Sequence, residues 1–206
     1  MKKNPYQGKF IVFEGLDGSG QTTQVKLLEN YLEGKGYRVV STKEPTQESE
    51  AGKEIKEILN HKKRISASRL QELFAQDRRE HLEGFIIPAL KEGKIVISDR
   101  YFFSSFAYGS SEGLELNWLL ELNKDFILPD ITFILKVKPE VCIERIEKRG
   151  EAKTLFEKQE KLREVWNVYK TFAEGFENVY IINGEKPKEK VFFQVKKIIF
   201  SNKINN

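Results

Sequence analysis

The sequence predicts an α/β fold with a central parallel sheet, because two kinds of pattern alternate along the chain. The first is a short apolar run, rich in β-branched and aromatic residues, which is typical of a strand buried on both faces. Such runs cover residues 10–13, 38–40, 95–97, 131–135 and 179–182. The second is a longer segment with helical character, found at residues 22–32, 53–59, 67–90, 140–148, 155–176 and 188–200. This alternation favours parallel strands joined by right-handed crossovers.

Two prolines mark expected helix boundaries. Pro88 falls near the end of segment 67–90, where a missing N–H and a ring clash should kink or split the helix. Pro139 suits the first position of the helix at 140–148. We expect a single domain over residues 1–206, with a frayed tail from Ser201 to Asn206.

The composition argues against several classes of protein. The net charge is only +4 and no long block of like charges occurs, so a nucleic-acid partner is not expected. No apolar run approaches the roughly 18 residues of a membrane span, and residues 1–9 lack the apolar core of a secretory signal. Cys142 is the sole cysteine, which excludes an intrachain disulfide. We therefore expect a soluble cytoplasmic protein without membrane association.

The strongest local motif is the glycine-rich stretch between the first strand and the first helix. It reads Gly15-Leu16-Asp17-Gly18-Ser19-Gly20-Gln21-Thr22. Glycines allow backbone N–H groups to curl around phosphate oxygens, and the helix N-terminus adds partial positive charge. Thr22 stands where a hydroxyl would bind magnesium. The alternative is a glycine-rich turn that binds nothing, but the flanking strand and helix favour a phosphate loop.

Two residues in this motif are unusual. Gln21 occupies the position of the lysine that normally neutralises the β- and γ-phosphate oxygens. Loss of one preorganised stabiliser typically costs about 2.7–4 kcal/mol of barrier, so another cation compensates or activity is low. Asp17 would repel phosphates unless its carboxylate faces an acceptor substrate or a magnesium-bound water.

A second cluster follows the run at 95–97. Asp99 and Arg100 stand at the carboxyl end of that expected strand, where ligands bind in open α/β sheets. Asp99 would hold magnesium through water, and Arg100 would bind an anion with two parallel hydrogen bonds. The alternative is a surface ion pair. The small, polar stretch from Ser104 to Gly109 suits close approach to a ligand.

Two further elements suit a nucleotide. Phe74 and Arg78 are four residues apart and so share a helix face, where an aromatic ring beside a guanidinium suits a planar base. The alternative is a core Phe74 with an Arg78 that extends its charged end to water. Lys43 precedes Glu44 and Pro45 just after the second strand, at another carboxyl end.

Taken together, these elements resemble the thymidylate kinase family from about Phe10 to Gly184. The shared motifs are Phe-Glu-Gly-Leu-Asp-Gly-Ser-Gly at 13–20, Lys-Glu-Pro at 43–45, Phe74 with Arg78, Asp-Arg-Tyr at 99–101, Ser104, Ala107-Tyr108, Leu-Pro-Asp at 128–130, Arg149-Gly150 and Phe156-Glu157. The resemblance implies the three-layer fold of P-loop NTP hydrolases, a five-stranded parallel sheet flanked by helices, with a lid at about 149–155. It also implies phosphoryl transfer from ATP to dTMP with Mg²⁺, giving ADP and dTDP for dTTP synthesis. The family is usually homodimeric, which makes a face of helix 67–90 a candidate interface.

The resemblance also implies residue roles. ATP would be bound by Gly15, Leu16, Asp17, Gly18, Ser19, Gly20, Gln21, Thr22, Arg145, Arg149 and Asn183, with Thr22 and Asp99 at the metal. The dTMP site would comprise Asp17, Lys43, Phe74, Arg78, Arg100, Ser104, Ser105 and Tyr108. Within it, Lys43 and Arg100 would hold the phosphate, Phe74 would stack on thymine and Arg78 would hydrogen-bond it. Tyr108 would crowd the sugar 2′ position. Catalysis would fall to Asp17, Arg100 and Lys153.

The sequence departs from the family pattern at four points. Gln21 replaces the loop lysine, and Lys43 replaces an arginine, which exchanges a bidentate fork for a point charge. Gly109 stands where a glutamine is common. The family supplies an arginine from the phosphate loop or the lid, whereas this chain has Gly18 in the loop and Lys153 in the lid.

These departures leave two other functions open. One is a kinase for another nucleoside monophosphate or for a nucleoside. The other is a nucleotide-binding homologue with impaired catalysis, because Gln21 lacks the lysine charge.

We hypothesise that Lys153, with Arg145 or Arg149, substitutes for the absent loop lysine. Lys153→Ala should therefore lower kcat by roughly a hundred- to a thousandfold, the effect of losing one transition-state stabiliser. The measurement is turnover at saturating ATP and dTMP beside the wild type, and an unchanged rate would contradict the hypothesis.

Overall fold

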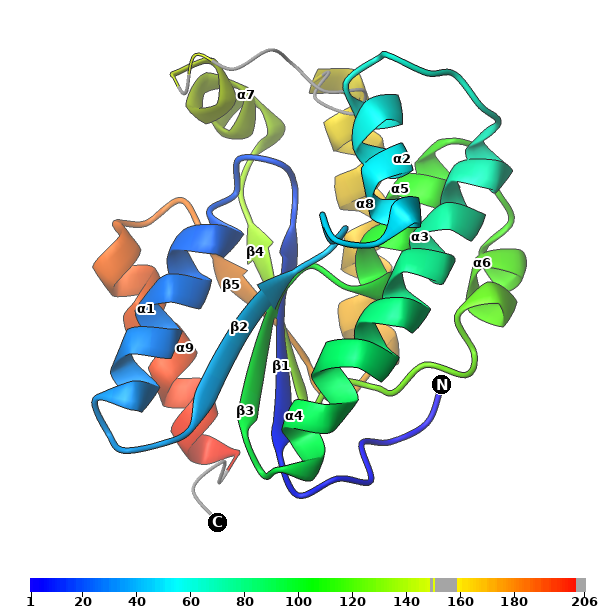
Figure 1. Ribbon diagram of the computed structural model, residues 1–206. Coiled ribbons are helices and arrows are strands. Elements are labelled where there is room, and N and C mark those ends of the chain that lie inside the picture. Colours follow the sequence, from blue (N-terminus) through cyan, green and yellow to red (C-terminus); the bar gives the residue numbers. More distant parts are fainter. Residues whose placement is uncertain (149, 151–158, 203–206) are drawn as a thin grey trace.

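The computed structural model describes residues 1–148, 150 and 159–202, and its centre is a five-stranded parallel sheet (Figure 1). The strands are β1 (Lys9–Gly15), β2 (Val39–Lys43), β3 (Ile95–Asp99), β4 (Ile131–Lys136) and β5 (Val179–Asn183). Their order is β2-β3-β1-β4-β5, which places β1 in the middle. The structure thus confirms the predicted fold class and the five predicted strands.

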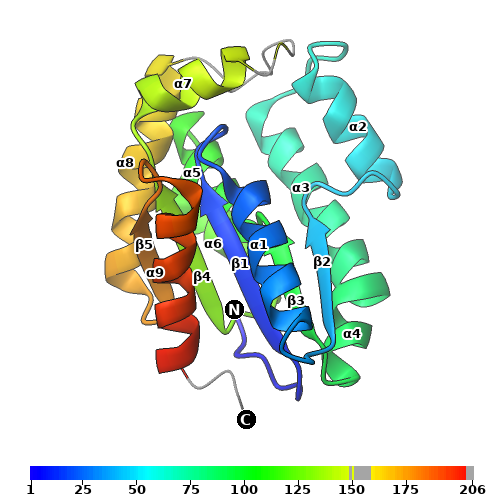
Figure 2. The same cartoon turned by 90° about the vertical axis from the view of Figure 1, so that its left-hand side faces the viewer.

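Helices cover both faces of the sheet and complete the three layers (Figures 1 and 2). Helices α1 (Gln21–Glu33) and α9 (Lys188–Ser201) cover one face. The other face is covered by α3 (Ala67–His81), α4 (Ile87–Lys91), α5 (Phe102–Ser111) and α8 (Gln159–Gly175). Helices α2 (Glu50–Leu59) and α6 (Leu116–Leu122) pack against this second layer, and α7 (Pro139–Lys148) lies beyond the carboxyl ends of the strands.

The central strand shows why the sequence pattern was continuous rather than alternating. Phe10 and Val12 of β1 pack toward α3, α5 and α8, while Ile11 and Phe13 pack toward α1 and α9. All four side chains are fully buried because successive strand residues point to opposite faces and both faces are covered.

The predicted break in segment 67–90 is present. Helix α3 ends at His81, a π-helical turn η1 spans Leu82–Ile86, and α4 begins at Ile87 with Pro88 in its first turn. A proline is tolerated in a first turn because the N–H it lacks would have no helical partner there. The wider π turn lies directly before this first turn and joins α3 to α4.

Two helices escaped the sequence analysis. In α5, Phe102, Phe103 and Phe106 are fully buried, and the helix is surrounded by other elements. It therefore lacks the polar stripe by which helices are recognised. Helix α6 is short, and Leu119 is its one buried residue.

The frayed tail expected from Ser201 does not begin there. Helix α9 continues through Ser201, and Asn202 accepts a hydrogen bond from the Tyr180 hydroxyl. Residues 203–206 of the expected tail lie outside the described residues. Residues 155–158 of the expected helix 155–176 lie outside the described residues. Within the described part of the chain, no helix is long and apolar enough to cross a membrane.

The strand register brings the expected site residues together. Asp99 at the end of β3 lies beside Phe13 of β1 on one side and Lys43 of β2 on the other. The loops that follow these three strands therefore emerge at one edge of the sheet.

Candidate active site

The phosphate loop joins β1 to α1 and lies under α7. Gly18 and Gly20 have φ angles of 83° and 102°, in the left-handed region that favours glycine. A Cβ at Gly18 would lie 2.7 Å from the carbonyl oxygen of Cys142 in α7. The contact with α7 therefore leaves no room for a side chain at position 18, and an arginine cannot stand there without movement of α7.

Gln21 braces this loop from inside. Its Nε2 donates to the Gly15 carbonyl at 2.9 Å, and its Oε1 accepts from the Ser19 hydroxyl at 2.9 Å. The side chain is buried and both ends of the amide are occupied. Gln21 thus ties the start of the loop to its middle, while adding no charge.

Thr22 and Asp99 meet at the edge of the sheet. The Thr22 hydroxyl donates to Asp99 Oδ2, and Lys43 Nζ lies 3.6 Å from the same oxygen. Asp99 does not pair with Arg100, which contradicts the simple surface ion pair considered above. Among the described residues no cluster of three His, Cys, Asp or Glu side chains could hold a metal. A hydroxyl beside one carboxylate still suits Mg²⁺, which binds few protein oxygens and keeps several waters.

A cavity of about 420 Å³ opens along one side of the phosphate loop. Its lining comprises residues 18–24 together with Leu135, Arg145, Gly184, Lys186, Lys188 and Val191. Arg145 Nη1 donates to the carbonyls of Gly18 and Ser19 at 3.4 and 3.3 Å, and its Nη2 donates to Gly184 at 3.2 Å. Arg145 therefore lies beside the phosphate loop, and the same cavity is lined by Lys186, which precedes α9, and Lys188, with which α9 begins.

Sequence reasoning missed Lys186 and Lys188 because a lysine-rich helix start resembles an ordinary solvated surface. Asn183 does not line the cavity, and its Oδ1 accepts from the backbone N–H of Glu185 at 3.0 Å. Arg149 and Lys153 lie outside the described residues, so their predicted roles stay predictions.

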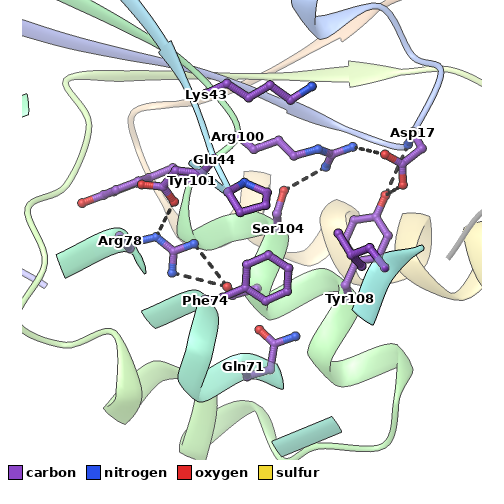
Figure 3. A pocket seen from close by; sticks show the side chains of 13 residues that line it. Asp17, Lys43, Glu44, Gln71, Phe74, Arg78, Arg100, Tyr101, Ser104 and Tyr108 are labelled. Atoms are coloured by element: carbon purple, nitrogen blue, oxygen red, sulfur yellow. Dashed lines mark hydrogen bonds and ion pairs between the residues drawn. The ribbon is translucent and has the colours of Figure 1, made fainter. Parts of the chain in front are cut away.

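A second cavity, of about 190 Å³, opens on the other side of the loop (Figure 3). It contains every residue that the resemblance assigned to dTMP: Asp17, Lys43, Phe74, Arg78, Arg100, Ser104, Ser105 and Tyr108. Its lining also includes Glu44, Pro45, Leu59, Gln71 and Tyr101. Residues from β2, α2, α3, α5 and the phosphate loop thus converge on one pocket.

One end of this pocket is built around Asp17 and Arg100. Arg100 Nη2 donates to Asp17 Oδ1 at 2.8 Å, while its Nη1 donates to the Gly15 carbonyl and the Ser104 hydroxyl. The Tyr108 hydroxyl donates to Asp17 Oδ2 at 2.7 Å. Burial would lower the pKa of Arg100, but the Asp17 carboxylate and other neighbours raise it well above its usual range. The guanidinium is therefore held charged at the mouth of the phosphate loop.

Arg100 also has a strained backbone. Its φ of 76° is in the left-handed region, which a residue with a Cβ rarely adopts. Its N–H donates to the Phe13 carbonyl at 2.8 Å, so the strain is fixed by the neighbouring strand. This backbone conformation directs a long cationic side chain back toward Asp17.

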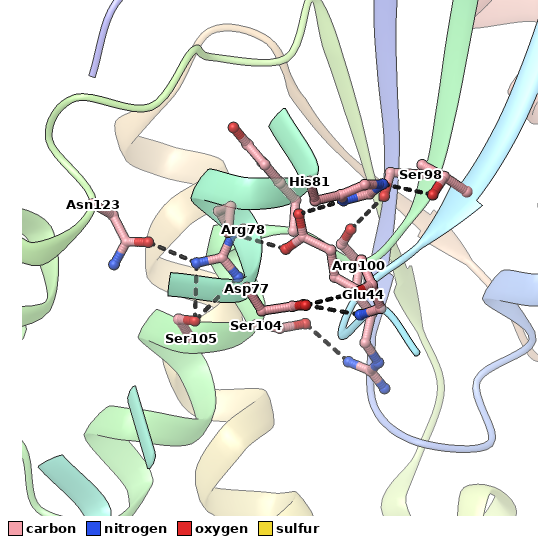
Figure 4. Close-up of polar contacts among 12 residues, drawn as sticks. Glu44, Asp77, Arg78, His81, Ser98, Arg100, Ser104, Ser105 and Asn123 are labelled. Atoms are coloured by element: carbon pink, nitrogen blue, oxygen red, sulfur yellow. Dashed lines mark hydrogen bonds and ion pairs between the residues drawn. The ribbon is translucent and has the colours of Figure 1, made fainter. Parts of the chain in front are cut away.

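The other end of the pocket contains Phe74 and Arg78 (Figure 3), and Figure 4 shows the polar contacts of Arg78. Arg78 is 1% exposed, which contradicts the alternative in which it extends to water. Its Nε donates to Glu44 Oε2 at 2.8 Å, and its Nη1 donates to Asn123 Oδ1 at 2.7 Å. Both Nη atoms also lie 3.3 Å from the Ser105 hydroxyl. Arg78 is thus a buried, oriented donor in the pocket wall.

Several partners of Arg78 were not predictable as such. Asn123 follows α6, and Glu44 also lies 3.1 Å from His81 Nδ1, a residue to which the sequence analysis assigned no role. His81 Nε2 lies 2.7 Å from the Thr42 hydroxyl, so both ring nitrogens have partners. These contacts join residues far apart in the chain, and no local pattern reveals them.

Glu14 is a further residue that sequence reasoning missed. It is fully buried and accepts from the N–H groups of Tyr101 and Ser104, and from the hydroxyls of Ser104 and Tyr169. Desolvation by burial raises its pKa from 4.5 to about 7, against the opposing charge of Arg100. A carboxylate within an otherwise apolar strand was the available signal.

Two pockets separated by a phosphate loop are the arrangement expected of an enzyme that moves a phosphoryl group between two nucleotides. The sequence model of the family described as thymidylate kinase matches residues 13–195. The chain is 46% identical to a probable thymidylate kinase of Pyrococcus horikoshii, over 86% of this chain and 89% of that protein. It is 38% identical to a thymidylate kinase of Caldicellulosiruptor saccharolyticus, over 94% and 96%.

A solved structure agrees with the sequence comparisons. The thymidylate kinase of Candida albicans superimposes with a TM-score of 0.84 at 26% identity, covering 98% of this chain and 96% of that chain. On the fold, the site and these relatives, the chain belongs to the thymidylate kinase family.

The raised pKa of Glu14 predicts a pH-dependent stability. A carboxyl whose folded pKa exceeds its unfolded value stabilises the fold most at low pH, and that contribution is lost as pH rises from about 4.5 to above about 7. We expect the free energy of unfolding of the wild type to fall by on the order of 3 kcal/mol across this window.

Urea unfolding at pH 4.5, 6 and 8 measures this effect. Glu14→Gln, which cannot titrate, should show a flatter dependence, whereas Glu57→Gln on the exposed side of α2 should match the wild type. Equal pH dependence in Glu14→Gln and the wild type would contradict the assignment.

Proposed function

We propose that this protein transfers the γ-phosphoryl group of ATP to the phosphate of dTMP, giving ADP and dTDP. The observation that carries the proposal is the position of the phosphate loop. Asp17 lines the smaller pocket, while Gly18 and the residues after it line the larger one. Consecutive residues of one loop therefore face two ligand sites, which we assign to dTMP and ATP respectively.

In the larger pocket, the loop N–H groups and the start of α1 would bind the ATP phosphates. Arg145, Lys186 and Lys188 add positive charge to the same pocket. Thr22 and Asp99 would hold Mg²⁺, which when bound neutralises phosphate oxygens. Because Gln21 is neutral and both its amide ends are occupied, we assign the charge of the usual lysine to Arg145, assisted by Lys153.

In the smaller pocket, Lys43 and Arg100 would bind the dTMP phosphate. Lys43 Nζ lies near Asp99 with its side chain 59% exposed, so it is free to turn toward an anion. Arg100 would exchange its Asp17 carboxylate for phosphate oxygens, which releases Asp17 toward the sugar. This exchange couples arrival of the acceptor to rearrangement of the loop that holds the donor.

The nucleoside would occupy the remaining space of that pocket. Phe74 would stack on the base, Arg78 would donate to it, and Ser104 and Ser105 would line its surroundings. Tyr108 would stand beside the sugar, where its ring leaves little space for a 2′-hydroxyl.

The reaction itself needs no strong base. A phosphate oxygen of dTMP attacks the γ-phosphorus, and the bond from that phosphorus to the bridging oxygen of ADP breaks. The protein contributes position and positive charge, through Arg100, Arg145 and Lys153. Asp17 keeps Arg100 in place until the acceptor binds.

We further propose that the protein is a cytoplasmic homodimer. The segment formed by α3, η1 and α4 carries Phe85, which is 41% exposed and stacks on His81. A large apolar side chain in this position suits a subunit contact.

A coupled ADP-release assay with ATP and Mg²⁺ tests the acceptor. We expect turnover selective for dTMP over dUMP, dCMP and dGMP. Arg78→Met should lower kcat/KM for dTMP at least about a hundredfold, because a buried charged donor is lost. Arg79→Met, at the neighbouring exposed position, should stay near the wild type. Preference for a different acceptor would replace dTMP in the proposal, and absence of turnover with every acceptor would refute it.

Substitutions at Arg145 and Gln21 test the replacement of the lysine charge. Arg145→Ala should lower kcat by about a hundredfold or more, as expected for one lost stabiliser. Adding Gln21→Lys to that variant should restore part of the loss. Arg163→Ala, which removes an exposed arginine paired with Glu140 on the surface, is the control. Wild-type kcat in Arg145→Ala would contradict the assignment.

A further inference from the structure

Gln71 is a buried polar residue of the smaller pocket whose amide has no hydrogen-bond partner among the described residues. It is 2% exposed, and its Oε1 is buried without a hydrogen bond. Its Nε2 makes none with the described residues either. Buried polar atoms are nearly always paired, since leaving one unpaired carries the cost of its desolvation. An unpaired amide in the wall of a ligand pocket therefore points to a ligand that completes it.

The position of Gln71 indicates which part of the ligand that is. It lies on α3, three residues before Phe74 and seven before Arg78, so the three side chains share a helix face. Figure 3 shows its amide directed toward Phe74, at the end of the pocket away from Asp17 and Arg100. A monophosphate held at Arg100 would place its base at this end. This step rests on the function proposed above.

Gly109 of the facing helix α5 makes room for the amide. A Cβ at this position would lie 3.4 Å from Cδ of Gln71 and 2.8 Å from a methyl of Leu119. Any larger residue would have to displace one of these side chains. Because Gly109 has no side chain, the amide of Gln71 can occupy the space next to the base.

We propose that Gln71 is a specificity determinant that recognises the pyrimidine edge of thymine. Its Oε1 accepts the N3–H of the base, and its Nε2 donates to an adjacent carbonyl oxygen. An amide alone can rotate and would also match cytosine. Arg78 removes this ambiguity. Glu44 and Asn123 orient Arg78 as a hydrogen-bond donor, which suits a carbonyl oxygen of thymine and is repelled by the amino group of cytosine. The pair therefore selects a base with a protonated N3.

The test compares dTMP with N3-methyl-dTMP, in which a methyl group replaces the N3 hydrogen while both ring carbonyls are kept. In the wild type, kcat/KM should be roughly ten- to a hundredfold higher for dTMP, the effect of one unmade buried hydrogen bond. Gln71→Leu should lower kcat/KM for dTMP by a similar factor, through a higher KM. The ratio of kcat/KM between the two acceptors should then be near one. KM for ATP should not change. Gln76→Leu is the control, because Gln76 is exposed on the same helix and bonds Glu80.

The outcomes separate this inference from the proposed function. If the wild type turns over dTMP normally and Gln71→Leu keeps the wild-type ratio of kcat/KM between the two acceptors, the role of Gln71 is overturned while the proposed function stands. Failure of the wild type to bind or phosphorylate dTMP overturns both. General damage to the fold would lower kcat/KM for both acceptors by the same factor, so the ratio of the two values would not change. If Gln71→Leu does not fold, Gln71→Met provides the same comparison with an unbranched side chain.

Discussion

The parallel register of β1, β2 and β3 is the constraint on which the site depends. Because β1 is central and buried on both faces, its position is fixed by packing from two layers of helices. Lys43 and Asp99 then end their strands beside each other, level with Phe13. The phosphate loop follows β1 directly, so the Lys43 ammonium, the Asp99 carboxylate and the backbone of this loop meet at one edge of the sheet. A shift of one residue in this register would turn each of these side chains to the opposite face.

The features that the sequence predicted are those with a local cause. Burial on both faces produced the apolar runs of the strands, and the glycines of the loop, the Phe74–Arg78 spacing and the position of Pro88 each have a short-range signature. Helix α5 had none, since Phe102, Phe103 and Phe106 are buried without a polar stripe. The partners of Arg78 could not be inferred because Glu44 and Asn123 are 34 and 45 residues away in the chain. Arg145 lies beside the loop and Lys153 lies outside the described residues, and the roles of both stay predictions.

The phosphate loop separates two tasks that a lysine would combine. A lysine at position 21 could both tie the loop to itself and neutralise phosphate oxygens. Gln21 performs the first task, through Gly15 and Ser19, and leaves the charge to other residues. The guanidinium of Arg145 already contacts carbonyls of the same loop from α7. The loop is thus held together by its own residue, while the nearest guanidinium reaches it from a separate helix.

The smaller pocket contains one buried side chain with several hydrogen-bond partners, Arg78, and one whose buried oxygen has none, Gln71. Burying the Arg78–Glu44 pair is costly, and such pairs are seldom the best way to stabilise a fold. Here the additional contacts of Arg78, to Asn123 and Ser105, engage further N–H groups and hold the guanidinium in one orientation. Gln71 is the reverse, an amide left without partners beside it. A fixed charged donor and an adaptable amide on one helix face together define the order of donors and acceptors that a base must present, which neither group could do alone.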